Sequence, residues 1–181
     1  MRTIRLLTAL ILAFALLDAV PANARARRAK PGPNCYKEFK GKIILDTKEF
    51  PEKFRTGKAC VRYMKPRNLK DKFHRSPSRD WNLYMFAFFN EPIGGDEFTM
   101  QIYKINGEEE TFVTEETYPI SPRLKTFFGQ ITLSEDEFEV GPTYEMRATR
   151  DVGDEEKVYA RKKFTLLEMK PVKKKRTRKR K

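Results

Sequence analysis

The sequence has 181 residues, of which 39% are hydrophobic, with 14 Phe, 7 Tyr and one Trp. This composition suffices for one compact domain, and it excludes both a wholly disordered chain and a multidomain enzyme. The 38 Lys and Arg residues exceed the 25 Asp and Glu residues, for a formal net charge of +13. The excess lies at the two ends: residues 1–30 carry six bases and one acid, residues 170–181 carry nine bases and no acid, and residues 31–169 carry 23 bases and 24 acids.

The start of the chain has the order of a secretory signal peptide. Two arginines precede an apolar run over residues 6–17, and Ala22, Ala24 and Ala26 follow at the spacing of a cleavage site. The run has about 12 residues, fewer than the roughly 20 that a membrane-spanning helix needs. We therefore expect a signal peptide over residues 1–24, cleavage after Ala24 or Ala26, and a secreted or periplasmic protein. No other apolar run approaches spanning length, so no transmembrane segment is expected in the mature chain.

The chain has two cysteines, Cys35 and Cys60. In an oxidising compartment such a pair favours a disulfide, and closing a loop of about 25 residues stabilises a fold by roughly 3 kcal/mol. Free thiols are one alternative, and a metal site completed by the single histidine and a carboxylate is another, although no spacing indicates zinc. We predict a Cys35–Cys60 disulfide, no metal ion and no cofactor.

Residues 25–34 mix bases with Pro and Gly and show no apolar period, which predicts a basic flexible leader. A β-sandwich domain is expected over residues 35–168. Short apolar segments separated by turn residues predict eight strands, at residues 41–46, 59–64, 81–89, 97–105, 111–117, 125–133, 143–150 and 157–167.

The segment that begins at Trp81 and ends at Phe89 is apolar at nearly every position. This is typical of a central strand covered on both faces, and the alternative is a strand whose outer face meets a loop or a partner. Helical signals are sparse. About eight short strands predict an all-β domain, as a two-sheet sandwich or a barrel.

The segment 138–148 carries the most specific structural signal. Phe138, a Gly-Pro turn and Tyr144 stand at the entry to a strand with alternating apolar positions. This arrangement resembles the tyrosine corner of immunoglobulin-like and fibronectin type III-like β-sandwiches, in which the tyrosine hydroxyl bonds a backbone group across the turn. The resemblance implies a single immunoglobulin-like antiparallel β-sandwich of about 7–8 strands, with Tyr144 as its structural corner. It departs from antibody domains because both cysteines lie in the first third of the chain.

The sequence contains no recognisable catalytic motif. His74 lies near Ser76 and Ser78, but a serine–histidine site depends on geometry, and a solvated loop histidine is the simpler interpretation. Acidic clusters at turns are usually solvated surface, and the Asp-Gly segment at 151–155 does not have the spacing of a calcium loop. We expect no catalytic, cofactor-binding or metal-binding residues and no enzyme activity. An enzyme of unrecognised type is the minor alternative.

Residues 169–181 are expected to form a disordered polybasic tail. Its bases would attract polyanions through counterion release, or an anionic membrane surface through charge. The tail residues that we expect to bind polyanions are Lys173, Lys174, Lys175, Arg176, Arg178, Lys179, Arg180 and Lys181.

Together these features predict an exported, non-catalytic binding or structural module of the cell envelope or extracellular space. The candidate partners of its tail are anionic lipid, polysaccharide and other polyanions. The alternative is a protein–protein interaction module that acts through the aromatic strand from Trp81 to Phe89 or through a polarised face. Such a face is expected because residues 31–79 hold 14 bases and 5 acids, whereas residues 80–169 hold 9 bases and 19 acids.

Overall fold

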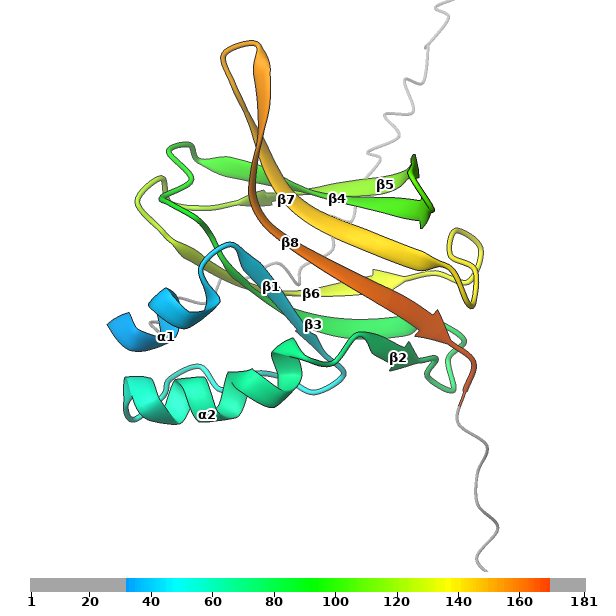
Figure 1. Ribbon diagram of the computed structural model, residues 1–181, viewed down its shortest axis with the longest axis horizontal. Coiled ribbons are helices and arrows are strands. Elements are labelled where there is room, and N and C mark those ends of the chain that lie inside the picture. Colours follow the sequence, from blue (N-terminus) through cyan, green and yellow to red (C-terminus); the bar gives the residue numbers. More distant parts are fainter. Residues whose placement is uncertain (1–31, 170–181) are drawn as a thin grey trace, which may run out of the picture.

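The computed structural model describes residues 32–169, which form two helices and eight strands (Figure 1). The expected signal peptide, most of the expected leader and the tail from residue 170 lie outside this range. In chain order the elements are α1 (Pro33–Phe39), β1 (Lys42–Asp46), α2 (Gly57–Asn68), β2 (Lys72–His74), β3 (Trp81–Phe88), β4 (Glu97–Asn106), β5 (Glu109–Pro119), β6 (Thr126–Leu133), β7 (Thr143–Val152) and β8 (Glu155–Leu167).

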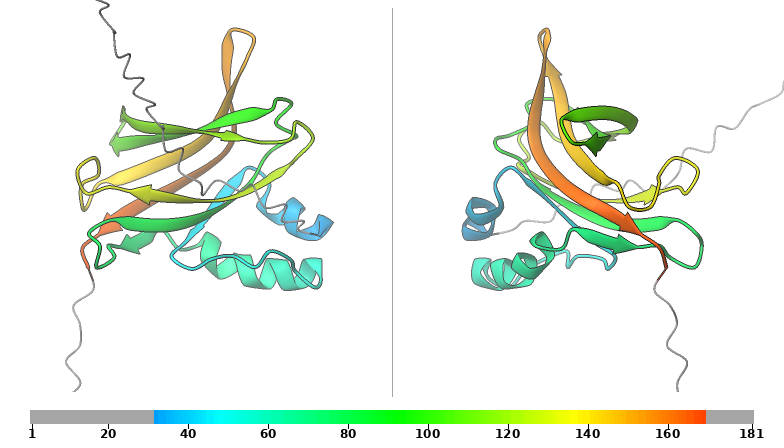
Figure 2. Two further views of the ribbon diagram at one scale, coloured as in Figure 1. Left: turned by 180° about the vertical axis from the view of Figure 1, so that it is seen from behind. Right: turned by 45° about the vertical axis from the view of Figure 1, so that its right-hand side comes forward.

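All eight strands belong to one sheet that curls into a half-barrel (Figures 1 and 2). The strand order is β5-β4-β7-β8-β1-β3-β6. The long strand β8 pairs with β7 along one edge, and its other edge pairs in parallel with β1 at Arg161 and with β2 at residues 165–167. The predicted all-β character is confirmed. The immunoglobulin-like sandwich is not confirmed, because the strands form one continuous curled sheet and not two sheets packed face to face.

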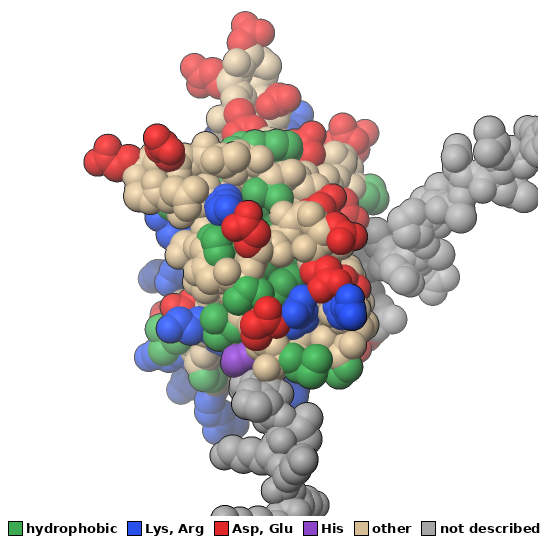
Figure 3. Space-filling model, turned by 90° about the vertical axis from the view of Figure 1, so that its right-hand side faces the viewer, with side chains coloured by type: hydrophobic (Ala, Val, Ile, Leu, Met, Phe, Trp, Pro, Cys, Tyr) green, Lys and Arg blue, Asp and Glu red, His purple; other side chains and the backbone are tan. Residues whose placement is uncertain are grey.

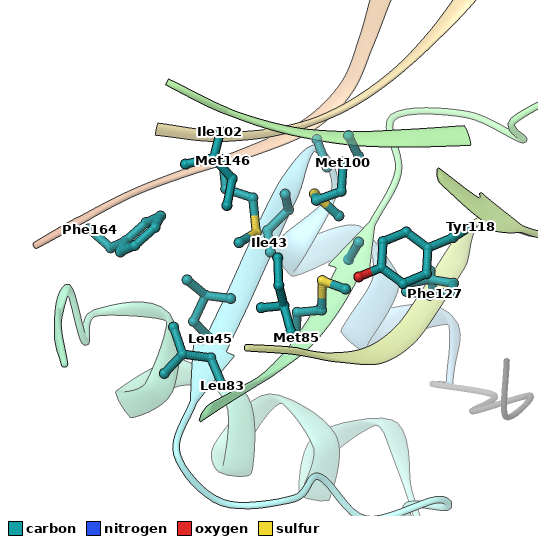
Figure 4. Close-up of a cluster of buried hydrophobic side chains, with 14 of the residues drawn as sticks. Ile43, Leu45, Leu83, Met85, Met100, Ile102, Tyr118, Phe127, Met146 and Phe164 are labelled. Carbon is teal, nitrogen blue, oxygen red and sulfur yellow. The ribbon is translucent and has the colours of Figure 1, made fainter. Parts of the chain in front are cut away.

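The main hydrophobic core fills the inside of the curl. Figure 4 shows side chains from β1 and from β3 to β8 that point toward one another there. The predicted alternation in β4 is confirmed, since Phe98, Met100 and Ile102 are at most 1% exposed. The labelled core residues are Ile43, Leu45, Leu83, Met85, Met100, Ile102, Tyr118, Phe127, Met146 and Phe164.

The two helices cover the outer face of β1 and β3 (Figure 2). A second buried cluster joins them to the sheet and includes Phe39, Met64 and Phe88. The predicted disulfide is confirmed: it links Cys35 of α1 to Cys60 of α2, with their Cα atoms 5.8 Å apart. Within residues 32–169, neither helix has the length and apolar character that crossing a membrane requires.

Strand β3 is covered on both faces, as its apolar sequence predicts. Leu83 and Met85 face the core inside the curl, whereas Phe86 and Phe88 face the helices. All four side chains are completely buried. The strand therefore joins the two hydrophobic clusters of the domain.

The predicted strand at residues 59–64 is wrong, because these residues form the middle of α2. The helix begins after Thr56, whose side-chain oxygen accepts a hydrogen bond from the Ala59 amide at 3.1 Å. Its buried side chains, Cys60 and Met64, are four residues apart, which is the spacing of one helix face. Over only six residues this pattern also fits alternation, so the strand interpretation could not be rejected from periodicity.

Two further elements were not predicted. Helix α1 has seven residues and includes Pro33 and Asn34, which belong to the predicted flexible leader. Strand β2 has only three residues, and its pairing with Thr165, Leu166 and Leu167 is a long-range contact. Such short elements are stabilised by tertiary packing, and their own residues carry no periodic signal.

The Tyr144 side chain crosses the turn that precedes β7. Its hydroxyl oxygen accepts a hydrogen bond from the Glu139 amide at 2.8 Å, and the hydroxyl donates to the Glu139 carbonyl at 3.2 Å. Burial of the phenol raises the pKa of Tyr144 above its ordinary value, so the hydroxyl keeps the proton that it donates. These two bonds hold residues 139–144 in a closed turn.

Candidate polyanion-binding surface

The loop between β1 and α2 is anchored by Phe50. Its ring is 2% exposed, and its centroid lies 5.9 Å from that of Phe86 and 6.1 Å from that of Phe128. The ring also meets Tyr63 of α2 edge-on, with centroids 6.4 Å apart. Because Phe50 is fixed between the sheet and the helix, the residues that follow it are held alongside α2.

A groove of about 460 Å³ lies between this loop and α2. The helix residues that line it follow a spacing of three and four positions, so they lie above one another on one side of α2. The rings of Phe54 and Tyr63 are in contact, with centroids 5.5 Å apart. The groove thus combines an aromatic surface with four cations. Its lining residues are Pro51, Lys53, Phe54 and Arg55 from the loop, and Ala59, Arg62, Tyr63 and Arg67 from α2.

Three of these four cations are available to a ligand. Lys53, Arg55 and Arg62 are exposed, and none of them forms an ion pair with another residue of the range 32–169. Arg67 instead has a structural role. Its guanidinium carbon lies 3.6 Å from the centroid of the Tyr63 ring, and Nη1 donates to the Tyr63 carbonyl at 2.8 Å.

Asp46 fixes the far end of the groove to the sheet. Its side chain lies at the end of β1, with Oδ2 at 2.7 Å from Arg67 Nε and Oδ1 at 2.8 Å from Lys70 Nζ. Burial raises the pKa of Asp46, but the hydrogen bond and charge of Lys70, the Thr47 amide and the charge of Arg67 outweigh it, so the pKa is lower than usual. The carboxylate is therefore ionised at neutral pH, and it holds Arg67 beneath Tyr63.

The groove belongs to the basic side of a polarised molecule. Residues 32–70, which include both helices, carry eleven bases and four acids. Residues 96–119, which include β4 and β5, carry seven acids and one base. The helices and the β4–β5 hairpin lie at opposite ends of the curled sheet (Figure 1). Figure 3 shows one side of this separation, with acidic side chains over the upper part of the face and basic ones along its lower left edge.

The site residues predicted from the sequence lie apart from this groove. Cys35 and Cys60 form the disulfide that joins α1 to α2. Tyr144 closes the turn that precedes β7. The polybasic tail lies outside the described residues. Its predicted binding residues are Lys173, Lys174, Lys175, Arg176, Arg178, Lys179, Arg180 and Lys181.

His74 and the serines beside it make separate contacts. The Nδ1 atom of His74 lies 2.7 Å from the Glu168 carbonyl oxygen, so this nitrogen carries the proton and donates it. The Ser76 hydroxyl donates to the Asp80 carbonyl at 2.7 Å and lies 2.6 Å from the Ser78 hydroxyl. Within residues 32–169, the imidazole makes no hydrogen bond to either serine, and no group of three or more His, Cys, Asp or Glu side chains could hold a metal ion.

The aromatic strand offers little surface to a partner protein. Trp81 is 1% exposed and Phe86, Phe88 and Phe89 are completely buried, which leaves Tyr84 as its one partly exposed aromatic residue. Large exposed hydrophobic side chains occur singly elsewhere in the described chain, as is normal for a protein surface. They are Leu69, Phe112, Val140, Val152 and Met169.

A strand over residues 59–64, as predicted from the sequence, would not form the groove. In a strand, Arg62 and Tyr63 would point to opposite faces, whereas the helix places both on one side with Ala59. A signal was nevertheless present. Thr56 is a favoured N-cap residue, and the apolar residues Cys60 and Met64 follow at helical spacing.

Comparison with known proteins gives no assignment. No model of a known protein family matches the chain, and no curated protein matches its sequence.

Proposed function

We propose that this protein is an exported, non-catalytic module that binds an anionic polysaccharide through the groove along α2, with its basic tail as a second contact. The observation that carries the proposal is the placement of Lys53, Arg55 and Arg62 around the Phe54–Tyr63 ring pair, with no ion pair to any of the three cations within residues 32–169. Aromatic lining with a few well-placed polar groups is the usual composition of a ligand site. Guanidinium groups pair with two oxygens of a carboxylate, sulfate or phosphate group at once.

The shape of the surface favours a polymer chain over a membrane. A membrane is broad, and proteins that lie on it present bases together with an extended apolar face. The groove is a shallow depression between a loop and one helix, and the exposed large apolar side chain near the end of α2 is the single residue Leu69. A linear anionic polymer could lie in the groove and place its charges beside the cations on both walls.

The disulfide supports export. Disulfides persist in oxidising compartments and are rare in the cytosol. The Cys35–Cys60 bond joins the two helices that carry the basic surface. A signal peptide over residues 1–24 would deliver the chain to such a compartment.

Two arginines of the groove provide the test, with immobilised heparin as the probe. We expect the double variant Arg55→Gln/Arg62→Gln of the mature protein to bind heparin about tenfold or more weakly, since each lost charge-assisted contact contributes on the order of 1 kcal/mol. Its affinity should also fall less steeply with salt, because fewer counterions are released. Affinity chromatography over a salt gradient measures both effects.

A matched control separates the groove from net charge. Lys72→Gln/Arg123→Gln removes the same charge from exposed residues that make no ion pair within the described chain. It should retain most of the heparin affinity. Equal losses for the two double variants would contradict a groove site. Groove-dependent binding to anionic vesicles without binding to heparin would identify a membrane, and not a polysaccharide, as the ligand.

A further inference from the structure

A second groove lies between the two edge strands of the half-barrel. Strands β5 and β6 converge where the rings of Tyr118 and Phe127 meet, with centroids 5.0 Å apart. Further along they separate around a space of about 190 Å³, which has Thr114 on one side and Leu133 on the other. Neither strand has a neighbouring strand on this side, so the edges of the sheet face each other across the groove.

The groove has an apolar floor and an acidic rim. Its floor is formed by Met100, Ile131, Leu133 and Phe138, which are 0–6% exposed. The exposed residues Glu115, Glu116 and Glu137 also line it. Within residues 32–169 none of them forms an ion pair. Glu115 and Glu116 instead interact with neutral groups, Glu115 with the Gln101 amide at 3.5 Å and Glu116 with the Tyr118 hydroxyl at 2.7 Å.

The described chain ends next to the wide end of this groove. Trp81 pairs with Leu133 of β6, and the Trp81 Nε1 atom donates to the Leu167 carbonyl, at the end of β8, at 3.1 Å. Arg75 connects the same two regions. One of its terminal nitrogens binds Glu135 and the other binds Glu168, both at 2.5 Å. The described chain therefore ends beside β3, which is the neighbour of β6 in the sheet.

We propose that the C-terminal segment 170–181 docks along the groove between β5 and β6. Twelve extended residues reach about 40 Å, more than the roughly 26 Å of the eight-residue strand β6, so the segment is long enough to follow the groove. Its nine bases are complementary in charge to the rim glutamates, which form no ion pair within residues 32–169. The long stems of Lys and Arg side chains can cover the apolar floor while their charged ends reach the rim.

Docking would give the tail two competing partners. While it lies in the groove, its bases are neutralised by the acidic side of its own molecule. A polyanion would therefore have to displace the segment from the groove before the polyanion could bind the segment. The docked form would also depend strongly on salt, because the Debye length falls from about 30 Å at 0.01 M to about 3 Å at 1 M.

Spin labels on the full mature chain test this docking. Gln130→Cys places one label on the exposed side of β6, Thr177→Cys places the other in the tail, and the native cysteines stay bridged. We expect a narrow, short-distance population by pulsed electron paramagnetic resonance at low salt, and its loss at high salt. A broad distribution at both salt concentrations would overturn the proposal.

Two charge variants identify the docking surface. Glu115→Gln/Glu116→Gln/Glu137→Gln should abolish the short-distance population. Asp151→Asn/Asp154→Asn/Glu155→Gln removes the same charge from exposed residues at the β7–β8 turn and should retain it. Retention in the groove variant would overturn the proposal. A short-distance population that vanishes on dilution with unlabelled protein would also overturn the proposal. In that case the tail would occupy the groove of a second molecule.

Discussion

At the scale of single residues, Asp46 is the charge on which the basic groove depends most. It is 5% exposed, and its carboxylate contacts both Arg67 and Lys70. Arg67 in turn stacks on Tyr63, whose ring forms part of the groove. One buried carboxylate thus ties the end of α2 to β1 and supports the aromatic surface.

Replacing this carboxylate should destabilise the fold. We expect Asp46→Asn to lower the free energy of unfolding by about 2 kcal/mol, because Arg67 and Lys70 lose their charged partner while remaining partly buried. Denaturant titration at neutral pH measures the loss. Asp71→Asn, at an exposed site, serves as the control and should change stability much less.

The effect of Asp46→Asn should depend on pH. The pKa of Asp46 is lower in the folded protein than in the unfolded chain, where it is about 3.9. The carboxylate therefore contributes its full stability above about pH 4, and this contribution is lost as the pH falls through the folded pKa. The difference between wild type and variant should shrink on acidification. A difference that stays constant from about pH 7 to about pH 2 would contradict this role for the charge.

At the scale of elements, the disulfide holds the helical layer together. It joins a seven-residue helix to α2 across 25 residues of sequence. Without it, α1 would be held mainly by Phe39, by the half-buried ring of Tyr36, and by the bond from the Tyr36 hydroxyl to the Phe89 carbonyl at 2.7 Å.

Removing the disulfide should weaken the whole domain. We expect Cys35→Ser/Cys60→Ser to lower the free energy of unfolding by about 3 kcal/mol, because the unfolded chain regains the entropy of a 25-residue loop. Urea denaturation followed by circular dichroism measures this. Chemical reduction of the wild-type protein should give a similar loss. An unchanged midpoint in both experiments would show that the helices are held by packing alone.

The strands were easier to predict than the helical layer, for a physical reason. Strand β4 buries every second side chain, and β3 is buried on both faces, so the sequence of each strand reflects its surroundings directly. Helix α2 buries only Cys60 and Met64 completely, and its exposed side carries bases, so its six central residues fit either period. The groove depends on the correct choice, because only a helix places Arg62 and Tyr63 on one side.

At the scale of the whole molecule, charge separation accompanies the fold. The basic helices cover the outer face of one end of the curled sheet, and the acidic β4–β5 hairpin forms its other end. The net charge of +13 does not reveal this arrangement. Nor could the sequence show that β8 ends beside an acidic groove, because the Trp81–Leu167 bond and the Arg75 bridges are long-range contacts.

The most direct test of the central claim is to map heparin binding on the full mature protein by amide chemical shifts. If heparin binds in the groove along α2, the largest shifts within residues 32–169 occur at 53–55 and 59–67, and they disappear in Arg55→Gln/Arg62→Gln but persist in Lys72→Gln/Arg123→Gln. Shifts in the tail and along β5 and β6 would accompany these if the tail is displaced. Shifts that leave the α2 groove untouched, with binding confined to residues 170–181, would contradict the account.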